Sequence, residues 1–247
     1  MANTDAVWEK FGASDPYYGV LSHEHFRSDK IDANRNEFFR SGEEQIASFI
    51  AKCEQRFGPI ERGRALDFGC GVGRLTLALA REFKDVVGLD ISPSMLKEAD
   101  RNAAELKQDR VTFALADDSL SNAPGSYDFV LTYIVLQHIP VSRGMRIIRN
   151  MLDKVKPGGG FVIHFSLRDF GVVDGALYWM RHNVPGMNAL RNIVTRRPLN
   201  TMGMQMNDYP LVKVFDMLDT LGITEALSFT QRHEKLLTVG LAGRRPE

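Results

Sequence analysis

The most constraining feature of the chain is a short apolar stretch that ends in an acid followed by three alternating glycines. Residues 65–73 read Ala-Leu-Asp-Phe-Gly-Cys-Gly-Val-Gly, with the acid at Asp67. The glycines are Gly69, Gly71 and Gly73. Glycine at alternate positions keeps Cβ atoms off the inner wall of the loop, so backbone can approach a flat ligand closely. A glycine-rich turn after a strand is often only a tight turn, which is the alternative interpretation.

The position of the glycines argues against a pyrophosphate ligand. In a dinucleotide-binding fingerprint the third glycine would fall one position later, where this chain has Arg74, and would open the helix that receives the pyrophosphate. The loop therefore predicts a site for a nucleoside that carries no phosphate.

A second acid closes the next apolar strand of the sequence. That strand ends at Asp90, and a carboxylate at a strand tip can accept hydrogen bonds from both hydroxyls of a ribose. The stretch 66–76, followed by 86–96, resembles the first two motifs of the class I S-adenosylmethionine-dependent methyltransferases. This resemblance implies a methyltransferase that uses S-adenosyl-L-methionine as its cofactor.

The resemblance also implies which residues contact the cofactor, because ligands of such folds bind beyond the carboxyl ends of the strands. One carboxylate of Asp117 or Asp118, with Asp117 favoured, is expected to accept from the adenine amino group; the alternative is a solvated turn or helix-cap acid. Ile91 and Met95 could enclose the adenine or belong to the core. Thr132 lies where the backbone of this family usually contacts the methionine part of the cofactor. The full set is Asp67, Gly69, Cys70, Gly71, Gly73, Asp90, Ile91, Met95, Asp117, Asp118 and Thr132.

Apolar strands alternate with amphipathic helices along the chain, which predicts an α/β fold with a mostly parallel sheet covered on both faces. With the resemblance, we expect a doubly wound, seven-stranded, Rossmann-like sheet. An N-terminal helical segment would precede it, and a helical lobe would be inserted after the fifth strand. The expected strands are 64–68, 86–90, 111–115, 127–133 and 161–166, followed by an antiparallel pair at 223–230 and 236–241.

Several helix boundaries can be placed from local patterns. Ser41 with Glu44 forms a capping box that predicts a helix start, and Ser92 with Pro93 predicts another. The inner face of the second helix is expected to carry Met95, Leu96, Ala99, Ala103 and Leu106. The run 156–160, Lys-Pro-Gly-Gly-Gly, is expected to end the helix that precedes the fifth strand.

We expect one catalytic domain over residues 1–247. Its expected parts are an N-terminal lid or substrate segment at 1–40, a cofactor-binding core at 41–166, an inserted substrate lobe at 167–207, and a C-terminal helix with the antiparallel strand pair at 208–247. A connection as long as 167–207 usually has structure and function of its own.

Composition limits the partners. Lys plus Arg and Asp plus Glu both number 31, so the whole surface has no net positive charge to attract a nucleic acid, and none is expected as a partner. No apolar stretch approaches the roughly 20 residues of a membrane span, and the polar start of the chain favours a cytoplasmic location. Cys53 and Cys70 are expected to be small buried residues rather than parts of a disulfide framework.

Methyl transfer depends mainly on alignment, since the sulfonium of the cofactor is already activated; a hydroxyl acceptor would also want a base. His138 and His164 are the candidates, with a positioning or core role as the alternative for each. Neither they nor His23 and His25 suggest a metal cluster, so no metal is expected. The candidate acceptor-binding residues are Tyr17, Tyr18, Asn207 and Tyr209.

The favoured function is methyl transfer to a small molecule, with oxygen of a sugar, lipid-linked or secondary metabolite as the preferred acceptor. One alternative is a methyltransferase that acts on a protein or nucleic acid, although the chain has no Asn/Asp-Pro-Pro-Tyr motif and no long basic tract. Another is a non-catalytic member of the fold that only binds the cofactor.

Overall fold

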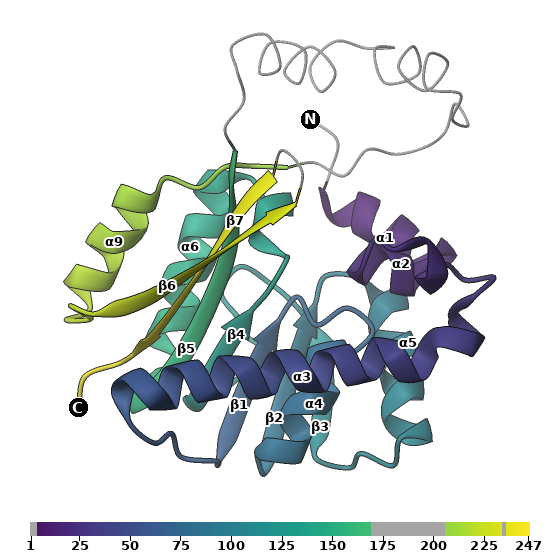
Figure 1. Ribbon diagram of the computed structural model, residues 1–247, viewed down its shortest axis with the longest axis horizontal. Helices are drawn as coiled ribbons and strands as arrows, with labels where there is room; N and C mark the ends of the chain where they lie inside the picture. Colours follow the sequence, from purple (N-terminus) through teal and green to yellow (C-terminus); the bar gives the residue numbers. More distant parts are fainter. Residues whose placement is uncertain (1–3, 169–205, 234–235) are drawn as a thin grey trace, which may run out of the picture.

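A seven-stranded sheet runs through the centre of the computed structural model, which describes residues 4–168, 206–233 and 236–247 (Figure 1). The strand order is β3-β2-β1-β4-β5-β7-β6, with β1 to β5 parallel and β7 antiparallel to both of its neighbours. The strands are β1 (Arg64–Phe68), β2 (Asp85–Asp90), β3 (Val111–Leu115), β4 (Tyr127–Thr132), β5 (Val155–Arg168), β6 (Ala226–His233) and β7 (Leu236–Arg244). The expected doubly wound, mostly parallel sheet is confirmed.

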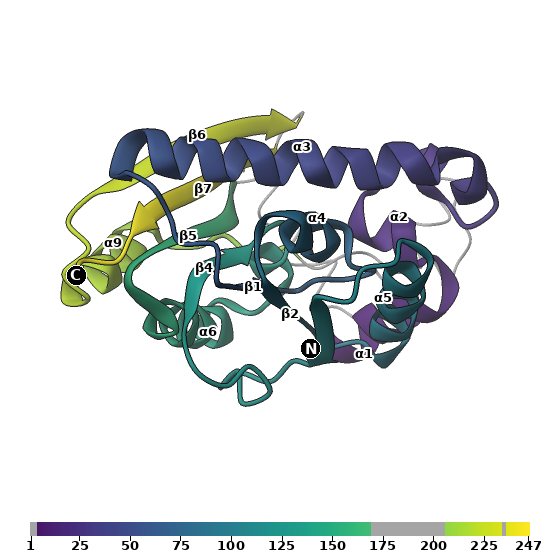
Figure 2. The same ribbon diagram turned by 90° about the horizontal axis from the view of Figure 1, so that it is seen from below.

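Helices cover both faces of this sheet. Figure 2 shows α3 and α4 on one side of the strands and α6 on the other. The described helices are α1 (Thr4–Ser14), α2 (Pro16–Val20), α3 (Ile31–Phe57), α4 (Arg74–Glu82), α5 (Pro93–Glu105), α6 (Val141–Asp153) and α9 (Leu211–Thr220), with short 3₁₀ segments at Glu24–Phe26 and Leu136–His138. No helix in these described ranges is long and apolar enough to cross a bilayer.

The hydrophobic core has one layer on each face of the sheet. Ile148 and Leu152 of α6 and Val214 of α9 pack with residues of β4 and β5 on one face. On the other face, residues of α3 and α4 pack against Phe129 and Val162. Because both faces are covered, the central strands are apolar almost throughout, as expected for parallel strands.

The order of the strands determines where a ligand can bind. From β1 the chain proceeds outward through β2 to β3 and then returns to β4 on the other side of β1. The carboxyl ends of β1 and β4 therefore diverge into opposite connections, and a crevice forms between them. Asp67 lies near the end of β1, in register with Gly88 of β2 and Leu131 of β4.

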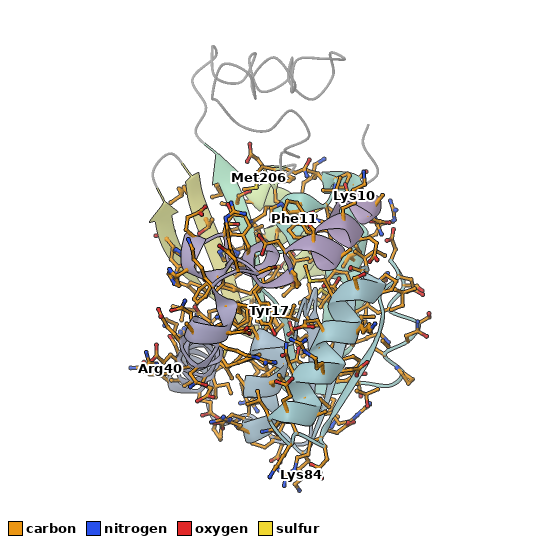
Figure 3. The ribbon with its side chains drawn as sticks, turned by 90° about the vertical axis from the view of Figure 1, so that its right-hand side faces the viewer. Lys10, Phe11, Tyr17, Arg40, Lys84 and Met206 are labelled. Atoms are coloured by element: carbon orange, nitrogen blue, oxygen red, sulfur yellow. The ribbon has the colours of Figure 1, made fainter. Side chains whose placement is uncertain are left out.

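The N-terminal helices cover this end of the sheet. Figure 3 shows Phe11 of α1 and Met206 at one end of the molecule, and Lys84, which directly precedes β2, at the other. A third apolar cluster joins Tyr17 and Phe38 to Val72 and Met95 of the cofactor-binding core expected at 41–166. The N-terminal segment is thus packed onto the sheet domain through its own apolar side chains.

The expected helix start at Ser41 is wrong. Helix α3 begins ten residues earlier, at Ile31, and the Ser41 hydroxyl donates to the Phe38 carbonyl within the helix at 2.6 Å. Ile31, Phe38 and Phe39 are buried, so the apolar face of the helix extends toward its N-terminus. Burial of that face outweighs the local capping pattern.

Two further boundary expectations also differ from the structure. Strand β5 already begins at Val155, so residues 156–160 belong to a strand with an irregular register against Tyr127 and Phe129 instead of separating helix from strand. Leu106, expected on the inner face of α5, follows the last residue of that helix and is 40% exposed, while Asn102 of α5 is fully buried and donates to the Val72 carbonyl at 2.9 Å. The cap formed by Ser92 is confirmed, since its hydroxyl accepts from the Met95 amide at 3.1 Å.

The inserted lobe expected at 167–207 lies almost entirely outside the described residues.

The two-layer core predicts a large cost for emptying its centre. Phe129 is fully buried, with its ring 5.8 Å from that of Phe83, whereas Phe215 on α9 is 45% exposed. We expect Phe129→Ala to lower the free energy of unfolding by about 3–5 kcal/mol, because it leaves a cavity. The control Phe215→Ala should cost less than about 1 kcal/mol. Chemical denaturation measures both, and equal losses would contradict the assigned core.

Candidate functional site

A cavity of about 920 Å³, including its part open to solvent, lies at the carboxyl ends of the central strands. The segments that follow β1, β2 and β4 form its floor and walls, and residues of α1 and α2 cover it. Many of the residues predicted from the sequence line it: Asp67, Gly69, Cys70, Gly71, Asp90, Ile91, Met95, Asp117 and His138.

The glycine loop after β1 is fixed by backbone hydrogen bonds to the end of β2. The amides of Gly69 and Cys70 donate to the Leu89 carbonyl at 2.7 and 3.0 Å. Gly69, Gly71 and Gly73 have φ values of 81°, 53° and 88°, in the left-handed region that favours glycine. A Cβ at Gly71 would lie 2.5 Å from a methyl of Val20, so this position tolerates no side chain.

Asp90 connects the glycine loop to α5. Its Oδ2 accepts from the Gly71 amide and its Oδ1 from the Ser92 amide, both at 2.9 Å. Burial raises the pKa of Asp90, while hydrogen bonds from the backbone amides of Ser92, Gly71 and Ile91 act in the opposite direction. Each carboxylate oxygen has a second lone pair, so Asp90 can accept further hydrogen bonds from a ligand in the cavity.

Asp67 is a buried acid with one hydrogen-bond partner in the described chain. The Thr76 hydroxyl donates to its Oδ2 at 2.7 Å. Burial raises the pKa of Asp67 to about 6, although Thr76 and the positive charge of Arg74 partly offset this effect. An acid with such a pKa in a cavity favours a cationic ligand group, which would restore its ionised form.

Of the two consecutive acids that follow β3, Asp117 lines the cavity. The Asp117 carboxylate accepts from the Ser119 hydroxyl at 2.9 Å and the Ser121 amide at 3.0 Å, and its bonds to Ser121 lower its pKa to about 2. Asp118 does not line the cavity and pairs with Arg143 at 2.6 Å. Asp117 thus has the turn-capping contacts of the alternative interpretation and also faces the cavity.

Gly73 and Thr132 lie close to the cavity without lining it. Gly73 is the N-cap of α4, and its left-handed φ turns the chain into that helix. Thr132 is fully buried at the end of β4. The three residues that follow it, Tyr133, Ile134 and Val135, line the cavity instead.

Helix α1 is held over the cavity by polar contacts that sequence reasoning did not identify. The Glu9 carboxylate accepts from the hydroxyls of Ser92 and Ser94, each at 2.6 Å, and so binds the start of α5. Asp5 pairs with Arg143 at 2.6 Å. These contacts join segments that are far apart in the sequence, so no local pattern indicates them.

The two candidate histidines occupy different environments. His138 is buried at the cavity wall, with its ring centroid 4.8 Å from that of Trp8 on α1. His164 lies on β5 behind the wall, where its Nδ1 accepts from the Ile134 amide at 3.3 Å. Ile134 has a φ of 62°, which is unusual for a β-branched residue. His138 can therefore touch a bound ligand, and His164 supports the wall.

None of the four candidate acceptor-binding residues is among the side chains that line this cavity. The Tyr17 hydroxyl lies within hydrogen-bond distance of the Glu98 carboxylate and the Asn102 side-chain oxygen, at 2.7 and 2.8 Å, and the Tyr18 ring packs under Arg27. The Asn207 and Tyr209 side chains donate to the carbonyls of Gln137 and Ile139, on either side of His138. The last two anchor the chain behind the wall that carries His138.

Arg74 is a cavity residue that sequence reasoning missed. In the sequence Arg74 occupies a glycine position of another motif, yet its side chain lines the cavity and is 5% exposed. Burial lowers the pKa of Arg74 to about 10, so the group stays positively charged at neutral pH. In the described part of the chain, no group of three or more His, Cys, Asp or Glu residues could hold a metal ion.

Comparison with known sequences identifies a related family over the centre of the chain. Residues 65–159 match the family model described as a methyltransferase domain. The ubiquinone biosynthesis O-methyltransferase of Leptothrix cholodnii is 34% identical over 108 residues, which cover 43% of this chain and 45% of that protein. The enzyme of the same name from Xanthomonas campestris pv. campestris is 35% identical over 97 residues, 39% of this chain and 40% of its own length. The chain spans less than half the length of these relatives.

Solved structures share the fold over more of the chain. Magnesium protoporphyrin IX methyltransferase from Synechocystis, with bound SAM, has a TM-score of 0.62 at 17% identity and covers 99% of this chain and 98% of its own. The N-methyltransferase NodS from Bradyrhizobium japonicum, in complex with S-adenosyl-L-homocysteine, has a TM-score of 0.56 at 18% identity, covering 94% and 100%. At these identities the likeness concerns the fold.

The raised pKa of Asp67 predicts a pH-dependent stability. In the folded chain the acid keeps its proton up to about pH 6, and unfolded it ionises near 3.8, so its contribution is greatest below pH 4 and is lost as the pH rises through 6. Relative to Asp67→Asn, the wild type should lose about 2.5 kcal/mol of unfolding free energy between pH 4 and pH 7. Urea denaturation of both proteins at several pH values measures this difference, and a constant difference would contradict it.

Proposed function

We propose that this chain, which belongs to the class I S-adenosylmethionine-dependent methyltransferase superfamily, binds S-adenosyl-L-methionine in the cavity and transfers its methyl group to a small-molecule acceptor. The observation that carries the proposal is the left-handed glycine loop, which lines one side of the cavity with backbone and is tied to Asp90. A nucleoside fits such a space, because backbone forms one wall and a carboxylate stands at its edge.

We assign the cofactor contacts by the chemistry of each wall. The free lone pairs of Asp90 can accept from ribose hydroxyls, and the side chains of Ile91 and Met95 offer apolar surface for adenine. Asp117 faces the cavity at that end and can accept from an exocyclic amine. Asp67 lies on the β1 side, where its buried carboxylate favours a positively charged amino group.

The cofactor supplies an activated methyl group, so the protein chiefly has to align the acceptor and exclude water. Helix α1 contributes to aligning the acceptor and to excluding water, because its residues Trp8 and Asp5 line the cavity. The position of this helix supports assigning residues 1–40 to a lid or substrate segment. We assign the sheet up to residue 166 to cofactor binding.

We further propose that the acceptor atom is oxygen. The relatives from Leptothrix and Xanthomonas are named O-methyltransferases, which supports an oxygen acceptor for the shared region. A hydroxyl acceptor gains from a base, and His138 is the only histidine among the described residues that line the cavity. We assign His138 the role of accepting the hydroxyl proton.

The proposed function makes a prediction about the cofactor. S-adenosylhomocysteine should bind the protein with micromolar affinity, and NAD should not bind measurably, because the loop has no seat for a pyrophosphate. Calorimetric titration with each ligand measures this. Binding of NAD without binding of S-adenosylhomocysteine would overturn the proposal.

Two variants on β2 test whether S-adenosylhomocysteine binds at Asp90. Asp90→Ala should weaken the affinity for S-adenosylhomocysteine at least tenfold, since a hydrogen bond to a charged group is worth about 1.5–3 kcal/mol. Asp85→Ala removes the same side chain at the other end of the strand, where the carboxylate pairs with Arg64, and should leave the affinity unchanged. Equal affinities of both variants would remove Asp90 from the site.

The proposed role of His138 makes a further prediction. With an acceptor identified by a screen with methyl-labelled cofactor, His138→Gln should lower turnover on the order of 100-fold. The affinity for S-adenosylhomocysteine should stay within about twofold of wild type. Wild-type turnover in this variant would show that His138 is not the base.

A further inference from the structure

The cavity contains a buried positive charge whose donors are largely unused. Arg74 has five N–H groups, and the one hydrogen bond recorded for its side chain within the described residues runs from Nη1 to the Ser41 hydroxyl at 3.1 Å. Its Nε is buried and has no partner in this part of the chain. A buried guanidinium without an anion is costly, so its presence at a cavity wall indicates a missing acceptor.

The second arginine of the cavity wall, Arg143, has carboxylate partners for its guanidinium. Arg143 pairs with Asp5 and with Asp118, each at 2.6 Å. For Arg74, no ion pair is found among the described residues, and the nearby Asp67 instead accepts from Thr76. The charge of Arg74 influences Asp67 without a direct bond between the two side chains.

The local structure makes room for this side chain and holds it in place. Arg74 is the first residue of α4, at the helix end where the backbone dipole also favours an anion. Gly42 of α3 lies directly beside it: a Cβ there would collide with the Arg74 carbonyl and come within 3.1 Å of its Cγ. Ser41, next to Gly42, orients the guanidinium by its hydrogen bond.

We propose that Arg74 binds a carboxylate of a ligand held in this cavity, next to the ammonium seat formed by Asp67. The inference rests on the proposed function, and two sources of the carboxylate follow from it: the amino-acid part of the cofactor, or an acidic acceptor. A buried acid and an unpaired guanidinium in one cavity are complementary to an ammonium and a carboxylate on neighbouring atoms.

The test compares two ligands that differ only in the amino-acid part. S-adenosylhomocysteine and 5′-methylthioadenosine share the nucleoside and the thioether, but the second has neither ammonium nor carboxylate. Arg74→Met should weaken S-adenosylhomocysteine at least tenfold in a calorimetric titration and leave 5′-methylthioadenosine within about twofold. Arg74→Lys, which keeps the charge and loses the forked donors, should fall between Met and wild type.

The control is Arg81→Met on the same helix, where Arg81 is exposed and pairs with Glu43. This control variant should leave the affinities for S-adenosylhomocysteine and for 5′-methylthioadenosine unchanged. The melting temperature of ligand-free Arg74→Met should be equal to or above that of wild type, because an unpaired buried charge is removed. A clear drop in that temperature, with both affinities lowered in parallel, would mean a structural role and overturn the proposal.

The remaining outcomes distinguish the two possible sources of the carboxylate. They also distinguish failure of this inference from failure of the proposed function. Unchanged affinity for both ligands together with at least a tenfold rise in KM for an acidic acceptor would place the carboxylate on the acceptor. Unchanged affinities and an unchanged KM would overturn the inference. If wild type binds neither adenosine compound, the proposed function itself fails, which is distinguishable because it does not depend on Arg74.

Discussion

The rest of the site depends on the hydrogen bonds that tie the glycine loop to the end of β2. Two loop amides share the Leu89 carbonyl, and a third donates to Asp90, so the loop cannot relax away from the neighbouring strand. This geometry requires positive φ values that only glycine adopts without strain. Because α4 begins directly after the loop, the same tie determines where Arg74 and Thr76 lie relative to Asp67.

Three charged groups are buried around this loop at a cost to the free protein. Burial raises the pKa of Asp67 and Asp90 and lowers that of Arg74, so each charged form is disfavoured by loss of water. Asp90 recovers part of this cost through two backbone amides, whereas Arg74 has little compensation within the described chain. Shifts of this kind concentrate at functional sites, where a ligand supplies the missing partners.

The sequence predicted the features that depend on neighbouring residues and missed those that depend on distant ones. The first four strands, the glycine loop and the Ser92 cap are local, and they were predicted to within a few residues. The start of α3 was wrong because the burial of Phe38 against Tyr17 and Phe26 decides it. Arg74 was missed because a one-dimensional pattern does not show that its side chain turns into the cavity.

The N-terminal segment is part of the cavity wall and of the core at the same time. Its cluster includes Val72 from the glycine loop and Met95 from α5, and Met95 also lines the cavity. Tyr17 illustrates the consequence: predicted as a substrate contact, it instead satisfies Asn102, whose own amide holds the Val72 carbonyl. A substitution at Tyr17 would therefore disturb the glycine loop indirectly, through Asn102. Effects of such residues on turnover can be attributed to acceptor binding only where the stability of the free protein and its cofactor affinity are unchanged.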